Sequence, residues 1–164
     1  MIISNSTPLI YLARLRKIDL VIKMYGKIII PREVYDEVIV KGKLLQKTEV
    51  VLLEELIKNA SIIIQEAGKL HHEIKSIHLG EAKAINLCLQ QNTKKILIDD
   101  KDAYELCKFF HLTPIRTTAF LLSCVREKLI TKKEFKELLI ELSKEGYFMS
   151  AEVFQLLVTE VEKQ

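Results

Sequence analysis

Four short runs of isoleucine and leucine constrain the fold of this 164-residue chain more than any other feature of its sequence. They lie within residues 1–3, 28–30, 62–64 and 96–98. Aliphatic runs of this length are too short for helices and are typical of buried strands. Stretches in which apolar residues recur with helical spacing separate these runs. The sequence therefore predicts an α/β fold with a parallel sheet and helices on both of its faces.

The size of the sheet and the division of the chain follow from the last third of the sequence. A short extended piece at residues 114–115 brings the expected sheet to four to five short strands. From Thr117 onward the pattern predicts helices only. We expect one domain over residues 1–164, with a core at about 1–125 and a helical C-terminal extension at about 126–164.

Several helix boundaries are predicted from local signals. Thr7, followed by proline, predicts a helix start with threonine as N-cap, and Pro31 predicts the start of the helix after the second strand. Residues 44–58 are expected to form one helix. A capping box at residues 131–134 and the serine at Ser150 predict the starts of the last two helices. The apolar stripes of these two helices serve either to cover the sheet or to form a dimer.

The composition is that of an ordinary globular chain, with 49% apolar and 29% charged residues. No apolar run reaches the roughly 18 residues that span a bilayer, and the first residues lack a signal-peptide pattern. We therefore expect a cytoplasmic protein without a membrane segment. The net charge of +3 permits nucleic-acid binding but is below the footprint of a dedicated binder. The three cysteines form no C-x-x-C pair, so we expect buried reduced thiols.

Acidic and amide side chains gather at one predicted edge of the sheet. In an open parallel sheet, ligands bind where the strands end and the following helices begin. Asn5 follows the first strand, Asp99 and Asp100 follow the fourth, Glu81 begins a helix, and Glu37 lies in the helix after the second strand. Several carboxylates at one edge require a positive ion to offset their repulsion, and oxygen ligands suit Mg²⁺ or Mn²⁺.

Each of these residues also has an ordinary structural interpretation. Glu81 is in line with the apolar residues of its helix, where a carboxylate is costly unless it is paired, but a glutamate in a first helical turn is also favoured by the helix dipole. Glu37 is either a ligand or a half-exposed helix carboxylate. Asp99 and Asp100 could form a turn and an N-cap. His71, His72 and His78 are expected to be solvent-exposed rather than metal ligands.

Four segments in order resemble the successive motifs of PIN domains. They are residues 5–10, 30–38, 80–85 and 97–103. The resemblance covers about residues 1–125, and it is greatest to a PIN-like subfamily of uncharacterised prokaryotic proteins related to VapC-type toxins. It implies a three-layer PIN-like fold and hydrolysis of RNA phosphodiesters with a bound Mg²⁺ or Mn²⁺.

The resemblance also assigns roles to residues of this chain. The implied catalytic acids are Glu37, Glu81 and Asp100; the implied metal ligands are Asn5, Glu37, Glu81, Asp99 and Asp100; and the implied substrate contacts are Ser6 and Thr117. It further implies RNA as a partner, an antitoxin-type protein partner and a homodimer. Receiver domains and aspartyl phosphotransferases, the competing classes, carry their acidic cluster after the first strand, where this chain has Asn5.

Asn5 is the departure from the pattern, because PIN nucleases usually carry aspartate there. An amide oxygen can ligate a divalent ion but brings no negative charge. The alternative interpretation is therefore a catalytically weakened or inactive PIN fold that binds nucleic acid or regulates.

Overall fold

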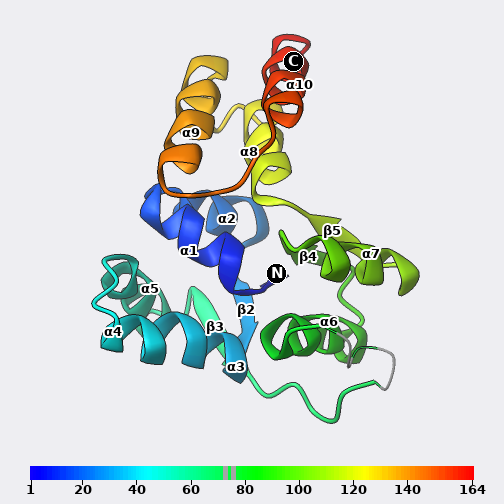
Figure 1. Cartoon of the computed structure of the whole chain (residues 1–164). Coiled ribbons are helices and arrows are strands. Elements are labelled where there is room, and N and C mark those ends of the chain that lie inside the picture. The colour runs from blue at the N-terminus through cyan, green and yellow to red at the C-terminus, as the bar shows by residue number, and fades with distance from the viewer. Residues whose placement is uncertain (72–73, 75–76) are drawn as a thin grey trace.

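Five parallel strands form the centre of the molecule, in the spatial order β3-β2-β1-β4-β5 (Figure 1). The strands are β1 (Ile2–Ser4), β2 (Ile28–Pro31), β3 (Ile62–Gln65), β4 (Lys95–Leu97) and β5 (Thr113–Ile115). The computed structural model describes residues 1–71, 74 and 77–164. Ile3 pairs with Ile29 on one side and Ile96 on the other, so three of the four isoleucine runs lie side by side. The prediction of a parallel α/β sheet is confirmed.

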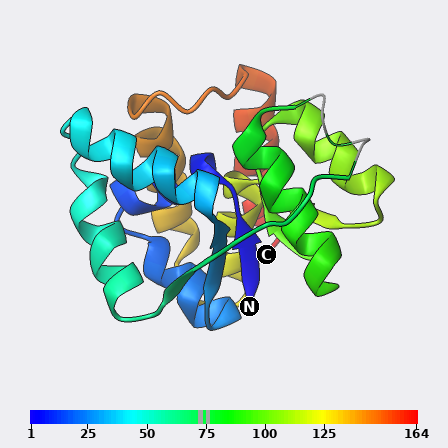
Figure 2. The ribbon, with the colours of Figure 1, turned by 90° about the horizontal axis from the view of Figure 1, so that it is seen from below.

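Alternation along the strands divides the core into two clusters, one on each face of the sheet (Figures 1 and 2). Ile2, Ile28 and Leu97 belong to the cluster that includes side chains of α1 (Ser6–Arg14), α2 (Ile18–Tyr25) and α8 (Thr117–Arg126). Ile3 and Ile29 belong to the cluster formed with α6 (Leu79–Gln91) and α7 (Lys101–Phe109). Because successive strand residues point to opposite faces, an uninterrupted aliphatic strand serves both clusters.

The helical segment after β2 differs from the expected one. It begins at Arg32 rather than Pro31 and runs through α3 (Arg32–Tyr35), a π-helical segment η1 (Asp36–Lys41) and α4 (Gly42–Leu44). A second helix, α5 (Glu49–Lys58), follows after a turn, so the single helix predicted over residues 44–58 is wrong. A Cβ atom at Gly42 would lie 2.6 Å from Val50 Cγ2. This close approach requires the chain to turn back between the two helices, with Gln46 in the left-handed conformation at φ 52°.

Other helix starts are partly as expected. Asn5, not Thr7, is the N-cap of α1, so the helix begins at Ser6. The N-caps predicted for the last two helices are confirmed. Thr131 Oγ1 accepts a hydrogen bond from the Glu134 N–H at 3.1 Å, and Ser150 Oγ accepts one from the Val153 N–H at 3.3 Å. These caps satisfy backbone donors that a helix start otherwise leaves unpaired.

The C-terminal extension packs mainly on α8, and its buried side chains join the core cluster on that face of the sheet. α9 (Lys132–Lys144) buries Phe135 and Leu139, whereas α10 (Ala151–Glu162) buries only Val161 completely. The loop between them, orange in Figure 1, runs back past α1, where the Tyr147 ring meets the Tyr11 ring edge-on at 5.1 Å. The three cysteines are free and buried, as predicted. Within the described residues, no helix is both long and apolar enough to cross a membrane.

Candidate functional site

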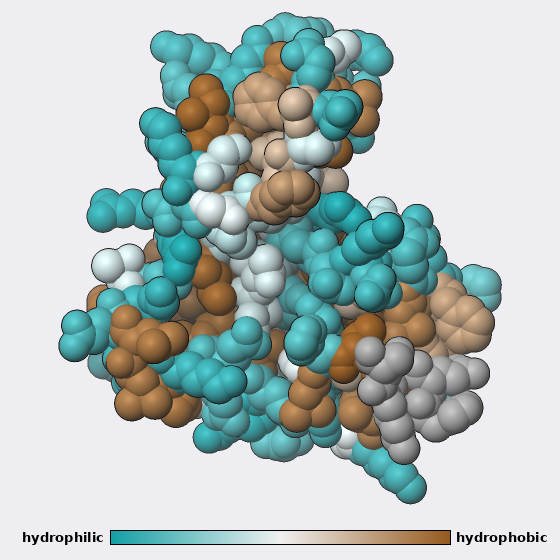
Figure 3. Space-filling model, in the orientation of Figure 1, coloured by the Kyte–Doolittle hydropathy of each residue, from teal (hydrophilic) through white to brown (hydrophobic). Residues whose placement is uncertain are grey.

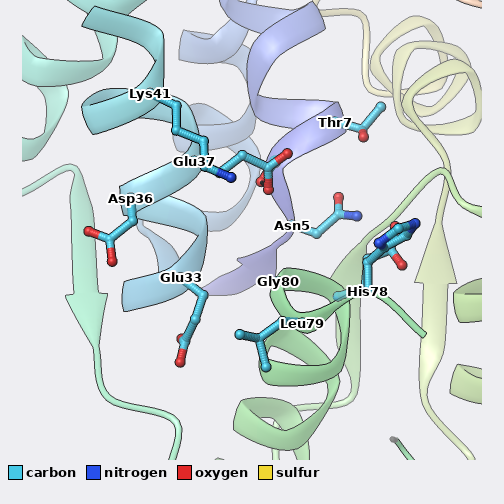
Figure 4. Close-up of a pocket in the computed structure, with 11 residues that line it drawn as sticks. Asn5, Thr7, Glu33, Asp36, Glu37, Lys41, His78, Leu79 and Gly80 are labelled. Atoms are coloured by element: carbon cyan, nitrogen blue, oxygen red, sulfur yellow. Dashed lines mark hydrogen bonds between the residues drawn. The ribbon is translucent and has the colours of Figure 1, made fainter. Parts of the chain in front are cut away.

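A cavity of about 600 Å³ opens beside the carboxyl end of β1, the central strand (Figure 4). It lies near the point where the strand order reverses between β1 and β4, the usual place for a ligand in an open α/β sheet. Three segments form its wall: the start of α1, the α3–η1 helix and the start of α6. We call this cavity the acidic pocket; its lining residues are Asn5, Ser6, Thr7, Glu33, Asp36, Glu37, Lys41, His78, Leu79, Gly80 and Glu81.

Asn5 lines this pocket, and its side-chain amide oxygen is buried (Figure 4). Its backbone N–H donates to the Leu97 carbonyl at 3.2 Å, which fixes the residue between the ends of β1 and β4. The residue is only 2% exposed, and Oδ1 has no hydrogen-bond partner among the described residues. A buried acceptor without a donor costs roughly 1–3 kcal/mol. The position therefore favours a ligand that can supply positive charge or a proton donor.

Glu37 enters the pocket from the π-helical turn. The Ser6 hydroxyl donates to Glu37 Oε2 at 2.6 Å, so one oxygen of this otherwise exposed carboxylate is held in place. A Cβ atom at Gly80 would lie 3.4 Å from the same oxygen, which shows how closely the start of α6 approaches η1. π-helical turns are rare and are frequent at functional sites. Ser6, which the resemblance assigns to substrate binding, contacts Glu37 in this structure.

Glu81 stands in the first turn of α6, three residues after its N-cap His78. Burial raises the pKa of the Glu81 carboxyl to about 7, and the negative charges of Asp100 and Glu37 add to this, while the ring charge and backbone N–H of His78 act against it. Glu81 Oε2 is buried without a hydrogen-bond partner among the described residues. Glu81 therefore holds its proton more readily than an exposed glutamate, and a bound cation would favour its charged form.

Asp100 lies on the far side of Glu81. It is the N-cap of α7, and its Oδ1 accepts a hydrogen bond from the Ala103 N–H at 2.9 Å. Together with Glu81, His78, Asp102 and Ile77 it lines a second hollow of about 320 Å³. Glu81 and His78 belong to both hollows, so the two are neighbouring parts of one acidic site.

Asp99 and Thr117 are placed elsewhere, and the roles expected for them do not fit this placement. Asp99 Oδ1 accepts hydrogen bonds from the Thr117 N–H and from the Tyr147 hydroxyl, both at 2.8 Å, and Oδ2 accepts one from Thr117 Oγ1 at 2.6 Å. Burial raises the pKa of Asp99, although these hydrogen bonds oppose the rise. Neither residue lines the two hollows. Both carboxylate oxygens of Asp99 are thus occupied by donors of the protein, and Thr117, which supplies two of these donors, is fully buried.

The donor set fits a hard divalent cation, although it is not gathered tightly around one point. Within the described part of the chain, no three His, Cys, Asp or Glu side chains are close enough to hold one metal ion. The set nevertheless combines carboxylates with a buried amide oxygen, and two of its oxygens, Asn5 Oδ1 and Glu81 Oε2, are unpartnered. Oxygen donors with unbalanced negative charge are what Mg²⁺ and Mn²⁺ bind.

Some residues of the site had no assigned role in the sequence-based prediction. Glu33 is a further acid after the second strand and Lys41 a basic residue near a predicted turn; they lie one helical turn on either side of Glu37, and that spacing of four brings both to the wall of the pocket. His78 is exposed as predicted, yet it lines both hollows. His71 is also exposed and meets the Phe110 ring edge-on, while His72 is outside the described residues. No local signal indicated Tyr147, which comes from the C-terminal extension.

The comparisons with known proteins agree with this architecture. A family model described as a PIN domain matches residues 1–163. The chain therefore belongs to the PIN domain family, a class with a nuclease-type fold. No curated protein and no solved structure matches the chain.

Proposed function

We propose that this PIN domain protein is an endoribonuclease that depends on Mg²⁺ or Mn²⁺. The proposal rests on one observation: two adjoining hollows at the carboxyl edge of the sheet are lined by Asn5, Glu37, Glu81 and Asp100. The side-chain oxygens Asn5 Oδ1 and Glu81 Oε2 are buried there without a hydrogen-bond partner among the described residues. Membership of the PIN domain family supports nuclease chemistry at such an edge. RNA as the substrate rests on the resemblance to VapC-type toxins.

The four residues would hold the ion through oxygen atoms. A bound divalent ion would lower the pKa of a coordinated water and neutralise charge on the phosphate. Ser6 keeps the Glu37 carboxylate oriented toward the pocket through its 2.6 Å hydrogen bond. The backbone of α7 does the same for Asp100 through Ala103. Lys41 lines the same pocket and adds a positive charge beside the carboxylates.

The test is metal-dependent cleavage of a structured RNA by wild type and by Glu81→Gln and Asp100→Asn. Each substitution removes one charge with little change of shape, and we expect cleavage to fall on the order of 100-fold or more. Glu137→Gln is the matched control, because that carboxylate lies on α9 with only a long contact to Lys133, 3.9 Å away. Cleavage that persists in both pocket variants, or in the presence of a chelator, would contradict the proposal.

Asn5 supports a second candidate, a PIN fold whose catalysis is weak or lost and which binds nucleic acid. The specific observation is that the ligand from the central strand is neutral, while the carboxylates are not gathered around one point. Asn5→Asp separates the two candidates. A sharp increase in cleavage would favour the weakened site, and wild-type cleavage already equal to that of the variant would favour an active enzyme.

Protein partners are also proposals, namely a second copy of the chain and an antitoxin-type protein. Exposed apolar side chains gather over α4 and α5, at the lower left of Figure 3, where Leu44, Leu45 and Val51 are 80%, 67% and 74% exposed. Such patches are typical of protein contacts. Light scattering of wild type and Leu44→Glu tests the homodimer: a dimer that becomes a monomer supports this contact, and a monomeric wild type excludes it.

A further inference from the structure

Tyr147 connects the C-terminal extension to the end of β4. It lies in the loop between α9 and α10, and its hydroxyl donates to Asp99 Oδ1, 48 residues earlier in the chain, at 2.8 Å. The Thr117 N–H and hydroxyl supply the other two hydrogen bonds of the same carboxylate. We call Asp99, Thr117 and Tyr147 the aspartate clamp. It unites the end of β4, the start of α8 and the extension.

The clamp lies next to the acidic site along the chain, because Asp99 and Asp100 share a peptide bond. On one side of that bond, the Ile98 N–H is tied to the Ile115 carbonyl at 3.0 Å. On the other side, Asp100 caps α7 through Ala103. With the Asp99 carboxylate held by three donors, the turn between β4 and α7 has little freedom. The direction in which Asp100 enters the site depends on that turn.

We propose that Tyr147 is a positioning residue for the acidic site: its hydroxyl fixes Asp99 and thereby the turn that presents Asp100. The inference rests on the proposed function, since it takes Asp100 as a metal ligand. Groups that hydrogen-bond a metal ligand directly typically change metal affinity 10- to 100-fold when they are removed. Tyr147 acts one residue further away, through Asp99, so we expect an effect at or below the lower end of that range. The C-terminal extension then contributes a residue, Tyr147, that shapes the site.

Tyr147 also packs through its ring, so the variant must separate packing from hydrogen bonding. Its ring meets Tyr11 at 5.1 Å with an interplanar angle of 84°. Tyr147→Phe keeps this contact and removes the hydroxyl, which donates to Asp99 and also interacts with the Thr118 side chain. Tyr25→Phe is the matched control, because that hydroxyl has no hydrogen-bond partner among the described residues and its ring lies against Phe120. Val161→Ala is a second control, since Val161 is the fully buried side chain of α10 and takes part in none of the clamp's hydrogen bonds.

Two measurements on the full chain decide the proposal. Calorimetric titration with Mn²⁺, well below the unfolding temperature, should show severalfold to about tenfold weaker binding in Tyr147→Phe and unchanged binding in both controls. Amide hydrogen exchange needs no metal. Protection of the Ala103 N–H, which donates to Asp100, should fall severalfold in Tyr147→Phe, and it should not fall in Tyr25→Phe.

The outcomes are distinct. Weaker Mn²⁺ binding and lower Ala103 protection in Tyr147→Phe alone support a positioning role. Unchanged protection in that variant, or an equal loss of affinity in Val161→Ala, overturns it. If the wild type binds no Mn²⁺, the proposed function fails, and the exchange of Ala103 alone then decides whether Tyr147 positions the turn.

Discussion

Two neighbouring aspartates of this molecule have different surroundings: Asp99 belongs to the aspartate clamp, and Asp100 lines the hollow that shares Glu81 with the acidic pocket. In the aspartate clamp, both oxygens of Asp99 accept hydrogen bonds from protein donors. In the acidic pocket, Asn5 Oδ1 and Glu81 Oε2 are buried and have no donor among the described residues, and the charges of Asp100 and Glu37 act on Glu81. A carboxylate supplied with three donors is stable without a ligand, whereas unpartnered acceptors among like charges are stabilised by a cation. The difference indicates which acids are structural and which are available for chemistry.

The largest effect should come from removing the clamp's acceptor. Asp99→Ala leaves the Thr117 N–H, the Thr117 hydroxyl and the Tyr147 hydroxyl without their partner, which we expect to cost about 3 kcal/mol. Thermal unfolding followed by circular dichroism should show a midpoint about 6–12 °C lower. Asp102→Ala, at an exposed position three residues along, should change it little. Equal midpoints for the two variants would remove the distinction between clamp and pocket.

The pocket should respond oppositely, by gaining stability from a cation. Mn²⁺ at about 100 times its dissociation constant should add about 2.7 kcal/mol, or roughly 5–11 °C in the unfolding midpoint. This gain should be lost in a variant that combines Glu81→Gln with Asp100→Asn and should persist in Glu137→Gln, whose carboxylate lies on α9 outside both hollows. If the unfolding midpoint of the wild type does not change with Mn²⁺, then Asn5 Oδ1 and Glu81 Oε2 do not bind this metal.

Without metal, the free energy of unfolding should fall as the pH rises, because Glu81 then loses its proton in the folded protein. The pKa of Glu81 is raised from 4.5 to about 7 in the folded protein, so the folded state binds more protons than the unfolded state between these values. The stability from Glu81 is therefore complete below about pH 4.5 and is lost as the pH rises through 7. Solvent screening reduces this to roughly 1–2 kcal/mol.

The measurement is the free energy of unfolding by urea at pH 5 and pH 7.5, with chelator, for wild type and Glu81→Gln. Because the pKa of Asp99 is also raised, its titration acts in the same direction, and the difference between the two proteins isolates Glu81. Parallel pH profiles for the two would show that Glu81 is not the strained carboxyl of the pocket.

The smallest effect should come from the serine that holds Glu37. Ser6→Ala removes the 2.6 Å hydrogen bond to Glu37 Oε2 and should cost about 1 kcal/mol, with a modest loss of Mn²⁺ affinity. Ser123→Ala is the control, because that hydroxyl donates only to the Ala119 carbonyl of its own helix. If Ser6→Ala binds Mn²⁺ as tightly as wild type, Glu37 is oriented by other contacts.

The sequence identified the sheet and most of the pocket because those signals are local. Isoleucine runs of strand length occur at Ile2–Ile3, Ile28–Ile30 and Ile62–Ile64, and all three form paired strands. The carboxyl ends of parallel strands share one edge, so residues just after them, such as Asn5 and Asp100, meet there by geometry alone. Capping residues such as Thr131 act on donors only three residues away, which makes them visible in sequence.

The break between α4 and α5 and the separate roles of Asp99 and Asp100 required the tertiary structure. Both depend on contacts between segments that the chain brings together only on folding: Val50 against Gly42, and Thr117 and Tyr147 against Asp99, 18 and 48 residues away. By itself the sequence determined the family pattern, the parallel sheet and the edge where acids gather. Only the tertiary structure decided that donors from two distant segments hold Asp99, whereas Asp100 accepts from the Ala103 N–H of its own helix and lines the hollow beside Glu81. The reason is that a hydrogen bond needs its partner within about 3 Å, and sequence spacing does not measure that distance.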